Sequence, residues 1–399
     1  MSPKIIHPDR IAEAAQSALD AAVTGTDRVP GVVAGITTAA STIHLGAAGR
    51  NAIGADTPIG TDAVFGIFST TKALTATVAL QLAEQGHLDL DAPARDYAPT
   101  LGDVQVITGF DDDGAPRLRP PASPPTTRQL LTHTAGFGYA FFNATYRRYA
   151  KAVGVPPVDR ATMAALRTPL LFDPGTRWEY GANLDWVGLV IEGVTGQCLS
   201  ATMTERLLAP LGMSDTGFTL TGDMGVRRAM MHTRRDGELV ELPGWAQPAE
   251  PEIDMGGQGL YSTVGDYLKF IRMWLRDGTS DSGIQILSPQ TVANAATNQI
   301  GDLRVTKLPG VIPAVSHDIE MFPGIPKSWG LSFMINEADA PTGRPAGSLG
   351  WAGLANLYFW IDRRNGIGGF WATQVFPFGD PGAFAHYTDY ESAVYRALA

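Results

Sequence analysis

The spacing of hydrophobic residues changes along the chain and predicts its elements in order. Apolar residues recur at helical spacing over residues 9–23. Two apolar runs, 32–37 and 42–48, then flank a short polar turn, which predicts a β-hairpin. Strand-like runs return only in the last third, and a final helix is predicted over 390–398. These late runs are 330–335, 356–361 and 368–375.

Between the two strand-rich ends, the pattern is mostly helical with loops rich in proline and glycine. This order predicts an α/β fold of the α+β type, in which an antiparallel sheet is built from both chain ends. We expect the two terminal helices to pack on one face of that sheet. The predicted domains are a discontinuous sheet domain of residues 1–68 and 255–399 and a mainly helical domain of residues 69–254.

The charge balance excludes some classes of partner. The 399 residues carry 30 lysines and arginines against 40 aspartates and glutamates, a net charge of −10, with no basic run. Such a chain has no surface suited to nucleic acid or to an anionic membrane. No apolar run approaches the roughly 18 residues that a transmembrane helix needs. The first residues lack the apolar core of a secretory signal, so we expect a cytoplasmic protein with small neutral ligands.

The sequence offers little for metal or disulfide chemistry. Cys198 is the only cysteine, which excludes an internal disulfide, and we expect it to be a small core residue. The seven histidines include no His-Glu-x-x-His and no close pair, and the aspartates at 111–113 are typical of a solvated turn. We therefore expect no metal and no other cofactor.

Candidate chemistry begins at residues 64–72, where a strand-like run over 64–68 leads into the helical pattern 73–85. Ser69 and Lys72 are three residues apart, so on a helix both would lie on one face. Near the first turn, Ser69 would also lie beside unpaired backbone N–H groups and the positive end of the helix dipole. This is a setting for a nucleophile, although the spacing alone is equally typical of a surface serine and lysine.

Two further motifs follow in order, and together they carry a resemblance. A Pro-Gly turn at 174–175 delivers Tyr180 to the start of a predicted helix, 184–193, and Gly350-Trp351-Ala352-Gly353 precedes a strand-like run. With Ser69-Thr70-Thr71-Lys72, the chain resembles the serine hydrolases of the class C β-lactamase and penicillin-binding-protein fold. It is most similar to their family VIII carboxylesterase branch. Other matching segments are 104–119, 130–136, 172–180, 210–213, 259–263 and 358–362.

The resemblance implies roles for three side chains at the interface of the two domains. Ser69 would attack a carbonyl and form an acyl-enzyme, which requires a base to take its proton. Lysine and tyrosine have ordinary pKa values of about 10, so burial would have to lower the amine's pKa and a close ammonium the phenol's pKa. The resemblance implies that Tyr180 is the base and later the proton donor to the leaving alkoxide, with Lys72 keeping it poised. The reverse assignment stays open.

The resemblance also implies an oxyanion hole and supporting residues. Its donors would be the backbone N–H groups of Ser69 and Leu354, the latter following Gly353 at the edge of the sheet. Gly353 would let the backbone approach the substrate. Asp185 is expected either to orient Lys72 or Tyr180 or to interact with its helix dipole. His133 lies in a segment that is structural in this family.

Two departures from the lactamase pattern bear on the substrate. This chain has Ala182 and then Asn183 where the lactamases place asparagine two residues after the tyrosine, and Trp351-Ala352-Gly353 where they have Lys-Thr-Gly. Tryptophan offers apolar area in place of a cation for a carboxylate. We expect small, short-acyl, uncharged esters as substrates. Other aromatic residues expected to line the mouth are Phe137, Tyr139, Phe141, Phe142 and Trp178.

The sequence thus predicts a serine carboxylesterase with a small-molecule ester substrate. Three alternatives use the same nucleophile: a β-lactamase, a D-amino-acid peptidase or amidase, and an acyltransferase. A fourth, from another class, is a non-catalytic β-lactam-binding module, which the intact Ser69, Lys72 and Tyr180 disfavour. The natural ester, its acyl length and the oligomeric state stay open.

Overall fold

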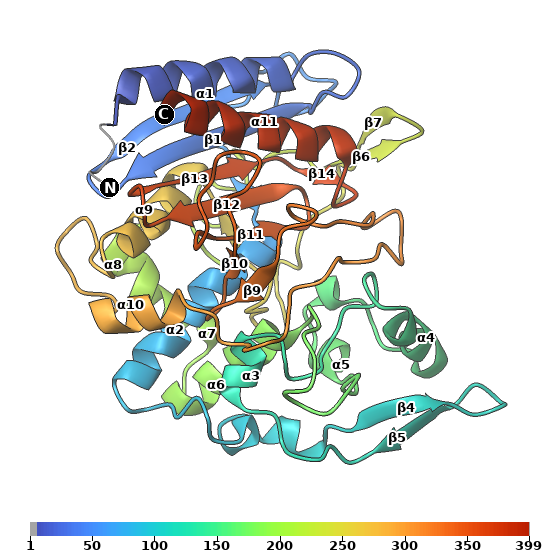
Figure 1. Ribbon diagram of the computed structural model, residues 1–399. Coiled ribbons are helices and arrows are strands. Elements are labelled where there is room, and N and C mark those ends of the chain that lie inside the picture. The colour runs from blue at the N-terminus through green and yellow to red at the C-terminus, as the bar shows by residue number, and fades with distance from the viewer. Residues whose placement is uncertain (1–5, 399) are drawn as a thin grey trace.

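Seven strands form one antiparallel sheet that draws on both ends of the chain (Figure 1). The computed structural model describes residues 6–398. Across the sheet the strand order is β2-β1-β13-β12-β11-β10-β9, and this confirms the predicted fold class. The bounds are β1 Gly31–Thr38, β2 Thr42–Gly49, β9 Lys327–Trp329, β10 Met334–Asn336, β11 Leu349–Gly353, β12 Leu357–Asp362 and β13 Ile367–Ala372.

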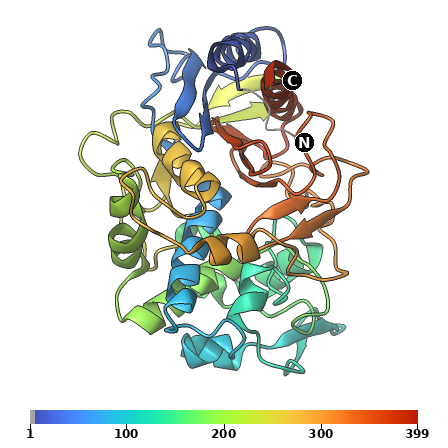
Figure 2. The same cartoon turned by 60° about the vertical axis from the view of Figure 1, so that its left-hand side comes forward.

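The two terminal helices, α1 (Pro8–Ala22) and α11 (Pro381–Leu398), lie side by side over one face of this sheet (Figures 1 and 2). Because side chains alternate along a strand, neighbouring residues of β12 face opposite layers. Tyr358 stacks on Tyr387 of α11, with ring centroids 4.3 Å apart. Phe359 instead contacts Tyr267 of α9 (Val264–Leu275), which therefore covers the other face.

The middle of the chain is mainly helical, as predicted, and its longest helix is buried on all sides. Every residue of α2 (Thr71–Glu84) from Thr71 to Leu82 is buried, which is typical of a core helix. The division at residues 69 and 254 stays a prediction. The other helices are α3 Thr127–Leu131, α4 Ala144–Val153, α5 Met163–Leu166, α6 Asn183–Thr195, α7 Leu199–Met203, a π-helical turn Thr204–Leu208, α8 Ala209–Leu211 and α10 Pro289–Ala295.

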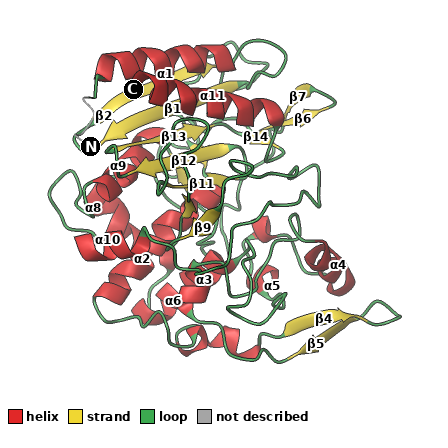
Figure 3. Cartoon of the chain, in the orientation of Figure 1, coloured by secondary structure: helices red, strands yellow, loops and turns green. Residues whose placement is uncertain are grey.

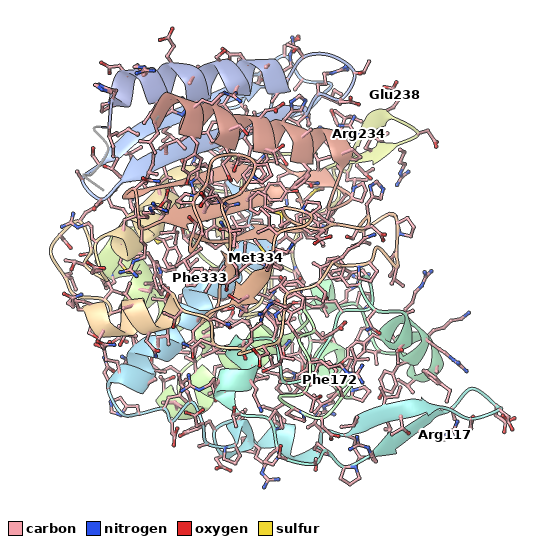
Figure 4. The ribbon with its side chains drawn as sticks, in the orientation of Figure 1. Arg117, Phe172, Arg234, Glu238, Phe333 and Met334 are labelled. Atoms are coloured by element: carbon pink, nitrogen blue, oxygen red, sulfur yellow. The ribbon has the colours of Figure 1, made fainter. Side chains whose placement is uncertain are left out.

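Short strands form hairpins and pairs outside the main sheet. In Figure 3 the lower half of the molecule contains one hairpin, β4 with β5, among helices and loops. Arg117 lies on this outlying hairpin, whereas Phe333 and Met334 lie near the centre of the molecule (Figure 4). The bounds are β3 Phe65–Gly66, β4 Val106–Phe110, β5 Pro116–Arg119, β6 His232–Arg235, β7 Glu238–Glu241, β8 Tyr261–Ser262 and β14 Val375–Phe376.

Several predicted boundaries were wrong. Residues 64–68 contribute only the two-residue strand β3, and a 3₁₀ turn, Phe68–Thr70, then precedes α2. Only Met334 and Ile335 of the predicted strand 330–335 belong to a strand, because β9 ends at Trp329 and β10 begins at Met334. Helix α11 begins at Pro381 rather than at residue 390. Asp380, whose carboxylate accepts the N–H of Ala383 at 2.9 Å, caps it, although Asp-Pro-Gly is also a turn sequence.

Two further expectations concerned the burial of Cys198 and the absence of a membrane-spanning helix. Cys198 is exposed, so the expectation that it is a core residue was wrong. It precedes the first residue of α7, and that position faces solvent. Among residues 6–398, no helix is both long enough and apolar enough to cross a membrane.

Candidate active site

Ser69 lies in the 3₁₀ turn immediately before α2, not within the helix itself. The turn is held by buried hydrogen bonds: the Ile67 N–H donates to the Leu260 carbonyl at 2.9 Å, and the Tyr267 hydroxyl donates to the Thr70 carbonyl at 2.9 Å. Phe68 has a φ of 44°, a left-handed conformation that is costly for an aromatic residue. The fold therefore imposes a sharp, strained turn that leaves the half-buried Ser69 at a cavity wall.

Lys72 is the basic group closest to the Ser69 hydroxyl. Its Nζ donates to Ser69 Oγ at 3.1 Å, to Tyr139 Oη at 3.2 Å and to the Gly257 carbonyl at 2.8 Å. Burial lowers the pKa of the Lys72 amine to about 7, although the charge of Asp185 opposes this shift. Near neutral pH the amine is therefore available in its neutral form, which can accept a proton from the serine.

Tyr180 lies on the other side of the same hydroxyl. Its Oη accepts a hydrogen bond from Trp351 Nε1 at 2.9 Å, and the Ser69 hydroxyl also bonds to it. Lys72 Nζ lies over the phenol ring, 4.8 Å from its centroid. Burial raises the pKa of Tyr180 above its ordinary value, although the bonds from Ser69 and Trp351 oppose this. The expectation that a close ammonium lowers the pKa of the phenol was wrong, because desolvation dominates.

Asp185 is connected to Lys72 through two other residues, Gly257 and Tyr139. One carboxylate oxygen accepts the Gly257 N–H at 2.8 Å, and the other accepts the Tyr139 hydroxyl at 3.4 Å. Both of those residues contact Lys72, so Asp185 is connected to the lysine indirectly and does not bond to it or to Tyr180. Its orienting role stays a prediction. Burial raises the pKa of Asp185, and the charge of Lys72 opposes this.

Gly257 has to be glycine at this position. A Cβ added there would lie 2.5 Å from Asp185 Oδ2, well inside contact distance. The sequence analysis did not identify Gly257 as a lysine ligand, since its carbonyl is 185 residues from Lys72 in the chain. The only local signal was the run Gly256-Gly257-Gln258-Gly259, which is typical of close packing.

The end of β11 brings a second backbone segment to the serine. Ser69, Gly353 and Leu354 line one cavity, and a Cβ on Gly353 would lie 2.6 Å from the Ile67 carbonyl oxygen. This places Leu354 beside the turn that carries Ser69. Strand β11 pairs with both β10 and β12, so it is internal and does not form the edge of the sheet as expected. The oxyanion roles of the two N–H groups stay a prediction.

The aromatic residues predicted at the mouth divide into two groups. Trp351, Tyr139, Phe141 and Phe142 line the cavity beside Ser69. Phe137 and Trp178 line neither this cavity nor the larger one described below, so their prediction as substrate-binding residues was wrong.

Both misplaced aromatic residues belong to the core. The Phe137 ring stacks on Trp186, with centroids 5.6 Å apart, and Trp178 packs on Trp329 at 5.6 Å. The closeness of these two residues to a motif in the sequence does not indicate whether each ring faces the cavity or the core.

His133 supports the loop below Tyr180. It is fully buried, and its Nδ1 lies 2.9 Å from Asn183 Nδ2, which also donates to the Phe137 carbonyl at 3.1 Å. Burial lowers the pKa of His133 well below its ordinary value. Asn183 therefore binds the loop and lies outside the lining of the Ser69 cavity. These contacts agree with a structural role for His133.

A larger cavity of about 520 Å³ adjoins the one at Ser69. The two share Tyr139, Phe141, Gln258 and Leu354 in their linings. Sequence analysis missed it, because its wall comes from segments far apart in the chain. Most of this wall is apolar; it includes Phe68, Ala150, Val155, Val158, Trp245, Ile312, Val315 and Phe376.

The positions of the side chains also show whether a group of them could bind a metal ion. Among residues 6–398, no three histidine, cysteine, aspartate or glutamate side chains are grouped so that they could hold a metal ion. What the site does bring together is a hydroxyl, a buried amine and a buried phenol, the groups needed for proton-assisted acyl transfer through a serine ester.

Comparisons with known proteins agree with this chemistry. The family model described as Beta-lactamase matches residues 15–393. Monacolin J acid methylbutanoyltransferase of Aspergillus terreus is 33% identical over 349 residues, covering 85% of this chain and 83% of that protein. Lovastatin esterase of Penicillium rubens is 31% identical over 329 residues, covering 79% and 80%. Unliganded simvastatin synthase (LovD) from Aspergillus terreus superposes with a TM-score of 0.83 at 29% identity, covering 98% of each chain.

Proposed function

Since this chain belongs to the beta-lactamase family of serine enzymes, we propose that it is a carboxylesterase that forms an acyl-enzyme on Ser69. The observation that carries the proposal is the contact of 3.1 Å between Lys72 Nζ and Ser69 Oγ, made by an amine whose pKa is lowered to about 7. A neutral amine at that distance is a general base in reach of the proton it must take.

In acylation, Ser69 Oγ attacks the ester carbonyl as the Lys72 amine takes its proton. The backbone N–H groups of Ser69 and Leu354 bind the oxyanion. Tyr180, whose pKa is raised by burial and which is therefore protonated at neutral pH, gives its proton to the departing alkoxide. This division favours Lys72 as the base and Tyr180 as the acid, the assignment that the sequence left open.

Deacylation uses the same groups. A proton passing from the Lys72 ammonium to the Tyr180 phenolate restores both residues. Water then attacks the acyl carbonyl while Lys72 takes its proton. As the tetrahedral intermediate collapses, Lys72 gives this proton to Ser69 Oγ, which leaves as the free hydroxyl. The products are a carboxylic acid and regenerated enzyme.

The two adjoining cavities suggest how an ester divides between them. The small cavity at Ser69 suits a short acyl group, and the apolar cavity of about 520 Å³ is of the size that holds a drug-sized group. We therefore extend the expected substrates to short-acyl esters of bulky, uncharged, apolar alcohols. Trp351 in place of a lysine supports uncharged substrates. The relative named lovastatin esterase supports hydrolysis.

Acyl transfer to an alcohol is the second candidate, and a separate observation favours it. Monacolin J acid methylbutanoyltransferase is named for moving an acyl group to an acceptor, and it aligns over 85% of this chain. An apolar acceptor alcohol in the large cavity would compete with water for the same acyl-enzyme. The two functions differ only in which nucleophile takes the acyl group from Ser69.

The test measures how the acyl-enzyme divides between water and an alcohol. Wild type and Ser69→Ala are incubated with p-nitrophenyl butyrate and increasing 1-octanol, and butyric acid and octyl butyrate are quantified. An esterase yields mainly the acid at all alcohol concentrations, whereas a transferase yields mainly the new ester. Equal turnover by Ser69→Ala would refute both candidates.

A further inference from the structure

We infer that Trp351 is a positioning residue that directs the proton of Tyr180 toward the leaving group, an inference that rests on the proposed function. The contact is a hydrogen bond of 2.9 Å from Trp351 Nε1 to Tyr180 Oη. Both side chains are buried, with 6% and 4% of their surface exposed. The sequence alone indicated only an apolar role for Trp351 toward the substrate.

The direction of this hydrogen bond leaves the phenol's own hydrogen available for donation. An indole N–H can only donate, so the Tyr180 oxygen must be the acceptor in this contact. The phenol's own hydrogen is therefore free to point elsewhere. The Ser69 hydroxyl also bonds to Tyr180 Oη, so the phenol lies beside the atom to which the acyl group is attached when the alkoxide leaves. Lys72 lies over the ring and not against the oxygen.

The same bond makes Tyr180 a stronger acid than burial alone would allow. Burial raises the pKa of Tyr180, and the hydrogen bond from Trp351 lowers it by stabilising the phenolate. A lysine at position 351, as in the Lys-Thr-Gly of the lactamases, would also be a donor, but a charged and flexible one. Tryptophan supplies a neutral donor with a fixed direction.

Packing holds the indole in this orientation. Trp351 lies in β11, where it pairs with Phe359 of β12. Its ring meets Trp329 edge-on at 4.6 Å between centroids and lies 4.8 Å from the Tyr180 ring. Rotation of the indole away from Tyr180 would disrupt these contacts, so the donor is preorganised before substrate binds.

This role predicts a dependence on the leaving group. An alkoxide is strongly basic and needs a proton as it leaves, whereas p-nitrophenolate is weakly basic and leaves without one. Trp351→Phe keeps an aromatic ring and deletes the N–H. We expect kcat/KM of this variant to fall about 10-fold or more for ethyl butyrate, and less than about 3-fold for p-nitrophenyl butyrate.

Trp178→Phe is the matched control. Its ring also packs against Tyr180, at 6.4 Å between centroids, but its Nε1 has no hydrogen-bond partner among residues 6–398. Any effect of this variant should be the same for both esters. In a Tyr180→Phe background, Trp351→Phe should cause no further loss with ethyl butyrate, because the group it positions is gone.

A second readout shows that the Trp351→Phe variant has a working nucleophile. An alkyl fluorophosphonate expels fluoride, which needs no proton from the phenol, so Ser69 should be labelled at the wild-type rate. Equal losses for both esters, with labelling intact, would overturn the positioning role and leave the esterase proposal standing. If wild type hydrolyses neither ester, the proposed function fails and the inference with it.

Discussion

Replacing Gly353 by alanine should displace one side of the predicted oxyanion hole. The added Cβ would lie 2.6 Å from the Ile67 carbonyl oxygen, 0.4 Å inside the 3.0 Å that real Cβ contacts hardly ever breach. It would also lie 3.1 Å from Leu357 Cδ1. The close neighbour is backbone, which cannot rotate aside, so the end of β11 must move away from the turn that carries Ser69. The N–H of Leu354 moves with it.

The expected loss follows from the size of this displacement. Removing one oxyanion donor costs about 10²–10³ in rate, and a misplacement of about 1 Å costs about 10². A shift of a few tenths of an ångström should therefore lower kcat roughly 10- to 100-fold, which is about 1.4–2.7 kcal/mol in the barrier. KM should change little, because the donor acts mainly in the transition state.

The assay is steady-state hydrolysis of p-nitrophenyl butyrate with a thermal melt of each variant. Gly265→Ala is the matched control, since a Cβ at that helical position would lie 3.8 Å from Leu45 Cδ2 and 3.8 Å from Thr263 Oγ1, which is ordinary contact. It should keep wild-type kcat. A Gly353→Ala enzyme that melts like wild type and keeps full kcat would refute the placement of Leu354 in the oxyanion hole.

Three further predictions concern the proton-transfer groups and the substrate. If neutral Lys72 is the base, kcat/KM should rise with pH through about 7 to a plateau. The charge of Asp185 raises the pKa of Lys72, so Asp185→Asn should lower that pKa and shift the midpoint to lower pH, and an upward shift would contradict this. Lys72→Ala and Tyr180→Phe should each remove most of kcat on an alkyl ester, and their double mutant should be scarcely worse, whereas multiplying losses would mean independent action. Nitrocefin should be hydrolysed much more slowly than p-nitrophenyl butyrate, and Trp351→Lys should narrow that ratio, because the apolar indole leaves the drug's carboxylate unpaired; equal wild-type efficiencies would refute the esterase assignment.

The fold could be predicted from the sequence where one hydrophobic period persists. The runs at 32–37 and 42–48 became β1 and β2 with small changes at their ends. The start of α11 could not be predicted in this way, because Asp380-Pro381-Gly382 has the composition of both a turn and a helix cap. Tertiary packing selects between these two outcomes, and it leaves no local signal.

The candidate site could be predicted only where its parts lie close in sequence or carry a motif. Ser69 and Lys72 lie within one helical turn, so their contact follows from spacing. Tyr139 reaches Lys72 across 67 positions, and Trp351 reaches Tyr180 across 171. The first contact depends on how the loop after α3 meets α2, and the second on how β11 meets the segment before α6. Sequence spacing encodes neither arrangement. The aromatic character of Tyr139 and Trp351 suggested apolar contact, whereas the structure uses their polar atoms.

Covalent phosphonylation of Ser69 tests most directly whether this residue is the nucleophile. The protein is treated with an alkyl fluorophosphonate, and its intact mass is measured before and after, with peptide mapping of the adduct. Wild type should give a single adduct, located at Ser69, and Ser69→Ala should give none. An adduct at another residue, together with esterase activity that survives Ser69→Ala, would contradict the assignment of Ser69 as the nucleophile.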